Sequence, residues 1–225
     1  MIKRVHPAIR HSPFVGAMAE YWIYFQAFLR SASGMASIAP SSRWTARAMV
    51  QGLEQLSGGA IVELGAGTGA ITAELLRVTA GRCRCLIVER DPQLCRRLRE
   101  RFRDAEIVEG DALNFDAMLR ERRIRQIDHV LCELPMNWFA PPDRDNLLAD
   151  ICRWLKPAGS FRQLSHLHWL GSGQYRCYFR EVTTRHVLRN VPPAGCFICR
   201  SPIHKPLARR LESRRGGEPV RLLQR

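Results

Sequence analysis

The stretch from Ala60 to Ile71, AIVELGAGTGAI, sets the architecture of this chain. Apolar β-formers come first, three glycines follow, and apolar residues then recur at the helical interval of about 3.6 residues. We therefore expect a buried strand, a tight turn and the start of a helix. Because glycine has no Cβ, a ligand can lie directly against such a turn, facing unpaired N–H groups at the helix N-terminus.

The spacing of the glycines distinguishes two kinds of cofactor. A dinucleotide fingerprint is G-x-G-x-x-G, whereas Gly65, Gly67 and Gly69 follow one another at spacing two. An acid, Glu63, precedes them, and an acid suits a cationic ligand. E-x-G-x-G-x-G resembles motif I of the class I S-adenosylmethionine-dependent methyltransferases, in which the turn holds the amino-acid end of a sulfonium cofactor. A glycine-rich turn without a ligand is the alternative that this motif alone leaves open.

Composition limits the class of protein. The chain has 225 residues, enough for one α/β domain with an arm and a tail, and its 46% hydrophobic content excludes wholesale disorder. Its 35 Lys+Arg against 21 Asp+Glu give a net charge of +14, which favours polyanionic partners such as nucleic acid or acidic lipid. We expect a basic, aromatic helical arm over residues 1–40, a cofactor-binding domain over 41–201 and a basic, disordered tail over 202–225.

Eight cysteines are scattered through the expected strands and helices without the framework of a small disulfide-rich domain. With no secretory signal visible, we expect reduced thiols in a cytoplasmic protein. Cys196-x-x-Cys199 has the spacing of a metal-ligand pair, but neither a second pair nor suitably spaced histidines accompany it. The alternating residues around it suit a strand, so we expect no metal site.

Runs of apolar residues alternate with amphipathic segments along the chain. This alternation predicts a parallel sheet covered by helices on both faces. The short joint at residues 190–194 predicts that the last two strands form an antiparallel hairpin. The expected strands are 60–63, 85–89, 106–108, 127–132, 160–167, 178–188 and 195–200. The expected helices are 42–56, ended by Gly58-Gly59, one after Gly69, one capped by Asp91-Pro92, and one from about 143 to 155.

Acidic residues stand where four of these strands end: Glu63, Glu89, Asp111 and Glu133. In an open parallel sheet, ligands bind outside the carboxyl ends of the strands. A carboxylate at Glu89 can accept hydrogen bonds from both ribose hydroxyls of a nucleoside. One at Asp111 can accept from an adenine amino group, with the N–H of Ala112 beside it. These positions predict a site for a nucleoside-bearing cofactor.

From residue 31 to about 201 the chain resembles the class I methyltransferases, and more narrowly the bacterial phospholipid N-methyltransferases, relatives of the ribosomal RNA adenine dimethyltransferases. The segments that carry the resemblance are 28–30, 38–42, 63–69, Val88-Glu89-Arg90, Gly110-Asp111-Ala112, 134–135 and 190–194. It implies a Rossmann-like α/β fold: a seven-stranded, mostly parallel sheet with a terminal antiparallel hairpin and an N-terminal helical arm. It also implies S-adenosyl-L-methionine as cofactor, held by Glu63, Gly65, Gly67, Gly69, Glu89, Arg90, Asp111 and Ala112.

The turn after the fourth expected strand departs from the family. In the base N-methyltransferases that the chain resembles, this turn reads Asn/Asp-(Pro/Leu)-Pro-(Tyr/Phe), and in the lipid enzymes we expect Ser-Gly-Leu-Pro. This chain has Glu133-Leu134-Pro135-Met136 instead. Glu133, Leu134 and Pro135 are the candidate catalytic residues. A carboxylate at Glu133 can hold an ammonium headgroup or receive its proton, and the alternative is a structural role at the strand end. In the base N-methyltransferases, the Asn/Asp and the Tyr/Phe of this motif contact the base. Both residues are replaced here, which weighs against an RNA base as the acceptor.

The leading hypothesis is an enzyme that methylates the amine of a phospholipid headgroup, phosphatidylethanolamine or its partly methylated products, at the cytoplasmic face of the membrane. The alternatives are an RNA (adenine) or small-molecule methyltransferase, and a non-catalytic protein that keeps the cofactor fold. No nucleophile triad is needed, because methyl transfer from a sulfonium is an in-line displacement that depends on positioning and exclusion of water.

The segment 14–29 is rich in aromatic and apolar residues at i, i+3, i+4, i+7 spacing, and it is shorter than the ~20 residues of a spanning helix. Basic residues flank it, and each adds about 1 kcal/mol of attraction near an anionic surface. We expect this segment to bind anionic membrane peripherally and to form, with residues up to 40, a lid over the site. Packing onto the domain's own core is the alternative.

Overall fold

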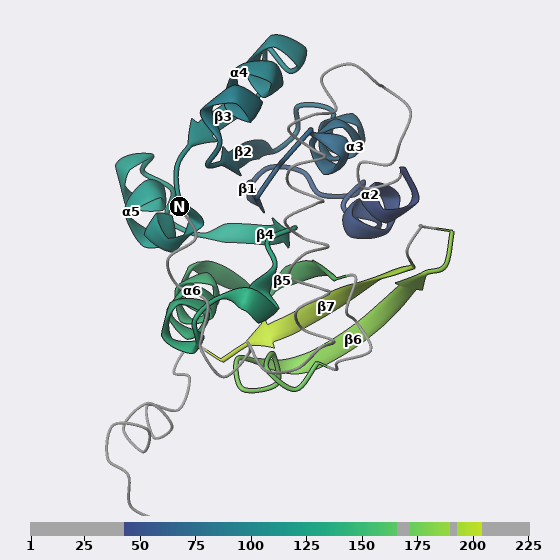
Figure 1. The fold of residues 1–225 in the computed structure, drawn as a ribbon, viewed down its shortest axis with the longest axis vertical. Coiled ribbons are helices and arrows are strands. Elements are labelled where there is room, and N and C mark those ends of the chain that lie inside the picture. The colour runs from purple at the N-terminus through teal and green to yellow at the C-terminus, as the bar shows by residue number, and fades with distance from the viewer. Residues whose placement is uncertain (1–42, 166–171, 190–192, 204–225) are drawn as a thin grey trace, which may run out of the picture.

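The computed structural model describes residues 43–165, 172–189 and 193–203. They form a seven-stranded sheet in the order β3-β2-β1-β4-β5-β7-β6 (Figure 1). The first five strands of the chain run parallel, whereas β7 is antiparallel to both β5 and β6. The expected mostly parallel sheet with a terminal antiparallel hairpin is confirmed. The strands are β1 Ala60–Leu64, β2 Arg84–Glu89, β3 Glu106–Glu109, β4 Ile127–Cys132, β5 Leu155–Ser165, β6 Phe179–Val187 and β7 Ala194–Pro202.

Helices cover both faces of this sheet and bury one apolar cluster on each face (Figure 1). α2 (Arg43–Val50), α3 (Ala70–Thr79) and α4 (Pro92–Arg101) contribute to one cluster, and α5 (Phe115–Glu121) and α6 (Pro141–Trp154) to the other. Strand β1 contributes to both, since Val62 and Leu64 lie in one cluster and Ile61 in the other. Burial on both faces explains why the first strand is an uninterrupted apolar run.

The start of α4 follows from its sequence. Oδ1 of Asp91 accepts hydrogen bonds from the N–H groups of Gln93 (2.8 Å) and Leu94 (3.2 Å), and Pro92 occupies the first turn. These contacts satisfy donors that the helix itself leaves unpaired, and the fixed φ of proline suits the first helical position. The expected cap at Asp91-Pro92 is confirmed, and it fixes the helix that follows the end of β2.

The helix expected over 42–56 is shorter than its apolar pattern indicates. α2 ends at Val50, and the chain turns at Gly52, whose φ of +85° lies in the left-handed region that favours glycine. Gly58 and Gly59 therefore end no helix and instead lead into β1. At Gly59 a Cβ would lie 2.0 Å from Oδ2 of Asp128, so the absence of a side chain is required by packing.

The boundary between α6 and β5 was also predicted incorrectly. α6 begins at Pro141, and β5 starts at Leu155 immediately after it, where residues 156–159 were expected as a loop. Ile127 of β4 pairs with Leu155, but His129 pairs with Ser160, so the extra residues form an irregularity within the strand. Between β3 and β4, two further elements had no counterpart in the sequence analysis: α5, and the short 3-10 helix η2 (Ala112–Asn114) that precedes it.

Several expectations fall on residues outside the described ranges. They include the helical arm and lid over 1–40, the joint at 190–192 and most of the basic tail. At the start of that tail, Pro202 belongs to β7, where it pairs with Phe179 of β6. The described domain therefore extends at least one residue beyond the expected boundary at 201.

Candidate functional site

The acids at the strand ends come together because β1, β2 and β4 are parallel neighbours. Glu63 of β1 is level with Ile87 of β2 and with Leu131 of β4. Glu89 and Glu133 follow those partners by two residues, so the three carboxylates lie at the carboxyl edge of the sheet. Both neighbouring acids raise the pKa of Glu63 electrostatically, in agreement with this proximity. The predicted gathering of acids at one edge is thus observed.

Glu63 is completely buried. Its Oε1 accepts a 3.0 Å hydrogen bond from the hydroxyl of Thr72 in the first turn of α3, while Oε2 accepts none from the part of the chain that the structure describes. Burial, followed by the charge of Glu133, raises the pKa of Glu63 well above its ordinary value. An acceptor in this environment gains most from a cationic N–H donor, which restores both a hydrogen bond and charge balance.

The three glycines of the turn have positive φ angles of +78°, +56° and +83°, but their surroundings differ. A Cβ at Gly65 would lie 2.7 Å from Cδ2 of Leu134, and one at Gly69 would lie 2.6 Å from Cε2 of Phe102. At Gly67 a Cβ would meet no heavy atom within 4 Å. The outer two glycines are therefore required by packing, whereas Gly67 faces the open space into which a ligand can come.

Glu89 ties the end of β2 to the glycine turn. Its Oε2 accepts a 2.8 Å hydrogen bond from the N–H of Gly67, and its Oε1 accepts from the N–H groups of Arg90 (2.8 Å) and Asp91 (2.9 Å). A carboxylate oxygen can accept two hydrogen bonds, so Oε2 keeps capacity for a ligand hydroxyl. Contact between Glu89 and a ribose stays a prediction, as does a role for Arg90, whose side chain is exposed.

Asp111 stands after the end of β3. Its Oδ1 accepts a 3.0 Å hydrogen bond from the N–H of Leu113 and so caps η2, in which Ala112 is buried. The N–H of Gly110 donates to the carbonyl of Glu89 (2.9 Å), which joins the ends of β3 and β2. The structure thus brings Asp111 and Ala112 to the same edge as the glycine turn, while their predicted contacts with adenine remain predictions.

The turn after β4 packs directly on the glycine turn. The N–H of Glu133 donates to the carbonyl of Leu64 (3.0 Å), and the side chain of Leu134 occupies the space beside Gly65. Pro135 precedes the short 3-10 helix η3 (Met136–Trp138). The three candidate catalytic residues therefore lie next to the predicted cofactor site, on the side of β4.

Gln163 of β5 is a residue of this region that the sequence analysis missed. It is 2% exposed, and its Nε2 donates to the carbonyls of Leu134 (2.8 Å) and Leu164 (2.7 Å). Its Oε1 accepts no hydrogen bond from any described residue. The available sequence signal was an amide side chain between the apolar residues Phe161 and Leu164 of the expected fifth strand. Because its amide donates a hydrogen bond to the carbonyl of Leu134, Gln163 positions the turn that carries Glu133.

The Cys-x-x-Cys pair does not form a site. Cys196 lies in the apolar cluster beneath α2 and α3, whereas Cys199 lies in the cluster on the opposite face of the sheet, since the two are an odd number of residues apart on one strand. Within the described ranges, no group of three or more His, Cys, Asp or Glu side chains is placed to hold a metal ion. The helices in those ranges are also too short or too polar to cross a membrane.

An open α/β sheet with a glycine turn and clustered acids at its carboxyl edge defines a protein that binds a nucleoside-bearing, cationic ligand. Comparison with known proteins identifies the family to which this protein belongs. Residues 61–159 match the family model described as a methyltransferase domain. An ornithine lipid N-methyltransferase from Singulisphaera acidiphila is 36% identical over 186 residues, which cover 81% of this chain and 97% of that protein.

Solved structures agree on the fold. The N-methyltransferase NodS from Bradyrhizobium japonicum, in complex with S-adenosyl-L-homocysteine, superposes with a TM-score of 0.61 at 16% identity, over 80% of this chain and 98% of that one. The 1,6-didemethyltoxoflavin-N1-methyltransferase from Burkholderia thailandensis gives 0.57 at 16% identity, over 84% and 90%. The chain belongs to the class I S-adenosylmethionine-dependent methyltransferases and, through its Singulisphaera relative, to the N-methyltransferases among them.

The residues present fit S-adenosylmethionine as cofactor. The unused Oε2 of buried Glu63 offers an acceptor to a cationic amine, and the space at Gly67 admits a ligand against the main chain. The remaining acceptor capacity of Glu89 suits a hydroxyl group. The expected cofactor is therefore confirmed, and the contacts of the individual residues with it stay predictions.

Proposed function

We propose that this enzyme methylates the amine of a membrane lipid headgroup, with an ornithine lipid as the first candidate acceptor. The observation that carries the proposal is the 36% identity to an ornithine lipid N-methyltransferase across 97% of that protein. Phosphatidylethanolamine and its methylated products are the second candidate, because the segments 38–42 and 190–194 resemble the phospholipid branch. Both acceptors present an amine at the surface of a bilayer.

Bound S-adenosylmethionine supplies an electrophilic methyl group, whose transfer forms one N–C bond and breaks one C–S bond, leaving that electron pair on sulfur. The acceptor nitrogen must carry a free lone pair when it attacks, and it releases one proton overall. Glu133, which follows the end of β4 and lies near Glu63, is the candidate to receive that proton or to hold the ammonium form beforehand. The hydrogen bond from the N–H of Glu133 to the carbonyl of Leu64 holds Glu133 next to the strand that leads into the glycine turn.

An RNA base is the competing acceptor, and the turn after β4 argues against it. In the base N-methyltransferases that the chain resembles, the first residue of this turn is Asn or Asp and the fourth is Tyr or Phe. Here Glu133 and Met136 stand at those two positions. Met136 is 2% exposed and packs within the apolar cluster under α6, so it offers no platform on which a base could stack. The basic net charge, in turn, suits an acidic lipid surface as well as RNA.

A peripheral position at the inner membrane face belongs to the same proposal. A two-chain lipid is almost never free in water, so its headgroup must be reached at the bilayer. The aromatic segment 14–29, proposed as membrane contact and lid, lies outside the described residues.

The experiment supplies purified protein with methyl-labelled cofactor and separate acceptors. These are mixed micelles containing ornithine lipid, micelles containing phosphatidylethanolamine, micelles of phosphatidylcholine alone, bulk RNA and small soluble amines. We expect label in one or both of the first two lipids and none in phosphatidylcholine. Gly67→Arg, which fills the space at the glycine turn, serves as the inactive control. Label in RNA or soluble amines with none in lipid would overturn the proposal.

A further inference from the structure

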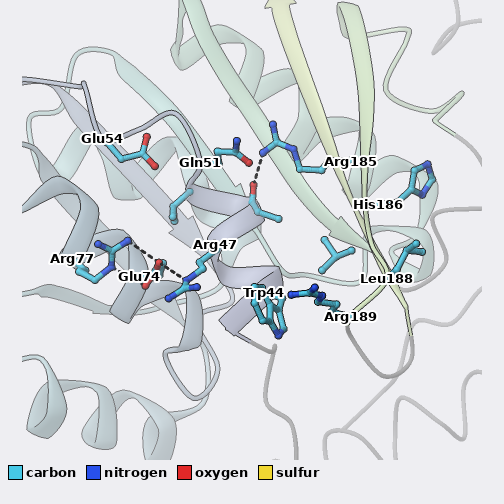
Figure 2. Close-up of a pocket in the computed structure, with 13 residues that line it drawn as sticks. Trp44, Arg47, Gln51, Glu54, Glu74, Arg77, Arg185, His186, Leu188 and Arg189 are labelled. Carbon is cyan, nitrogen blue, oxygen red and sulfur yellow. Dashed lines mark hydrogen bonds and ion pairs between the residues drawn. The ribbon is translucent and has the colours of Figure 1, made fainter.

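The start of α2 and the end of β6 together build a surface that the methyltransferase chemistry does not use. We call it the Trp44 patch: Arg43, Trp44, Arg47, Leu188 and Arg189. Three guanidinium groups surround the indole ring, at 5.2 Å for Arg43, 5.7 Å for Arg47 and 4.8 Å for Arg189, measured to the ring centroid. Figure 2 shows Arg189 against Trp44, with Leu188 next to it.

The patch combines exposed positive charge with exposed apolar surface. Leu188 is 76% exposed, the most exposed large apolar side chain among the described residues. Arg43 and Arg189 form no ion pair with any residue in the described ranges. Arg47, by contrast, forms an ion pair with Glu74, with 3.4 Å between its Nε and Oε1 of the carboxylate. Two of the three cations around Trp44 are therefore available to an anionic partner. A flat indole flanked by cations and a protruding leucine is the residue set that favours the headgroup level of a bilayer.

A hollow of about 780 Å³ adjoins the patch between α2, α3 and β6 (Figure 2). Arg77 and Arg185 add positive charge to its lining, and Arg185 is held there by a 3.3 Å hydrogen bond to the carbonyl of Ala48. Glu54 and Glu74 are the acids of that lining, and Glu74 is engaged by Arg77 at 2.8 Å. The hollow is thus net basic and large enough to admit acidic headgroups.

The patch lies at the edge of the sheet that carries the active site. Val187 at the end of β6 pairs with Ala194 of β7, and the next residue of β7, Gly195, pairs with Ser165 at the end of β5. Because β5 runs parallel to β4 and β1, β6 ends at the carboxyl edge of the sheet (Figure 1). Leu188 and Arg189 directly follow that end of β6. A bilayer seated on this patch presents its headgroups toward the edge at which Glu63 and Glu133 lie.

We propose that the Trp44 patch docks the enzyme on an anionic phospholipid bilayer, with Trp44 and Leu188 at headgroup level and the arginines on acidic headgroups. The inference rests on the proposed lipid acceptor and identifies the surface that meets the membrane. Charge complementarity selects this occupant, since the chain carries a net charge of +14 and the free cations of the patch border an apolar tip. An RNA partner would engage the arginines but would leave Leu188 in water.

The test is sedimentation with vesicles of phosphatidylcholine containing 30% phosphatidylglycerol, a composition of about one anionic lipid in three, at several salt concentrations. The variant Arg43→Glu/Arg189→Glu is compared with Arg96→Glu/Arg97→Glu on α4, which makes the same charge change on exposed arginines elsewhere. We expect the patch variant to bind at least about tenfold more weakly than the parent and the α4 variant to bind within about twofold of it. Leu188→Asp should lower the binding that persists at high salt.

Equal weakening by both double variants, or none by either, would overturn the docking surface. A patch variant that loses RNA binding while sedimenting normally with vesicles would also overturn it and assign the surface to nucleic acid. Methyl transfer to lipid in neutral detergent micelles is measured in parallel and should be unchanged in the patch variant. If the parent methylates no lipid in micelles, the proposed acceptor is wrong, independently of the vesicle result.

Discussion

The hydroxyl of Thr72 donates a 3.0 Å hydrogen bond to Oε1 of Glu63, and both residues are completely buried. This pair joins the strand before the glycine turn to the helix after it. The hydrogen bond lowers the pKa of Glu63, but burial and the charge of Glu133 outweigh it, so the pKa is raised overall. The fold therefore holds an acid that is costly to ionise until a cationic ligand compensates it.

Glu63→Gln should stabilise the protein without ligand and weaken cofactor binding. A carboxyl whose pKa is raised on folding costs no stability below its unfolded pKa, and stability is lost as the pH rises through the folded value. The parent should therefore lose stability relative to Glu63→Gln as the pH rises, in urea unfolding at pH 5 and pH 8. Cofactor affinity should fall by about tenfold or more, since a hydrogen bond to a charged group contributes about 1.5–3 kcal/mol.

Thr72→Val is the companion variant for that experiment. It removes the side-chain hydrogen bond that lowers the pKa of Glu63 and keeps the backbone of residue 72, so its loss of stability between pH 5 and pH 8 should exceed that of the parent. A Glu63→Gln protein that tracks the parent at every pH would contradict the raised pKa.

Gly67→Arg should remove cofactor binding and leave the fold intact. The position has open space around it, so the substitution costs chiefly the strain of a side chain at φ +56°, about 1–2 kcal/mol. Gly81→Arg is the matched control, because Gly81 has φ +74°, equally open surroundings and a place after the far end of α3. Calorimetry should detect binding by the control and none by Gly67→Arg, and equal binding by both would place the cofactor elsewhere.

The candidate cofactor site could be predicted from local sequence because its parts are local. The spacing of three glycines and an acid at each strand end identified the turn, and the alternation of strands and helices identified the sheet. Parallel pairing then brings Glu63, Glu89 and Glu133 together without further information.

The features that sequence analysis missed depend on contacts between distant segments. Gln163 reads as an isolated polar residue, and only the packing of β5 on the turn after β4 gives its amide a partner in Leu134. Trp44 and Arg189 lie at opposite ends of the described domain in sequence but 4.8 Å apart in space. By contrast, α5 had a local signal, since Phe115, Met118 and Leu119 are buried at helical spacing, and that signal was overlooked.

Glu133→Gln should lower turnover while cofactor affinity stays within about threefold of the parent. The substitution removes a like charge near Glu63, so the pKa of Glu63 should fall toward its ordinary value. Methyl-transfer assays across pH would measure the turnover, and the pH dependence of cofactor binding would measure the change in the pKa of Glu63. Unchanged turnover, with the expected change in the pH dependence of binding, would assign Glu133 a purely electrostatic role next to the cofactor.

Gln163→Leu should slow methyl transfer by about tenfold while the cofactor still binds. The variant keeps the side-chain volume but removes the Nε2 donor that holds the carbonyl of Leu134 at 2.8 Å, which leaves the turn carrying Glu133 less firmly positioned. Gln174→Leu is the control, because it deletes a 2.8 Å amide contact to Asn137 further along the same turn. We expect kcat to fall for Gln163→Leu alone, with thermal unfolding used to correct for stability. A parallel loss of cofactor affinity would mean that Gln163 supports the whole edge of the sheet and not the acceptor side of the site.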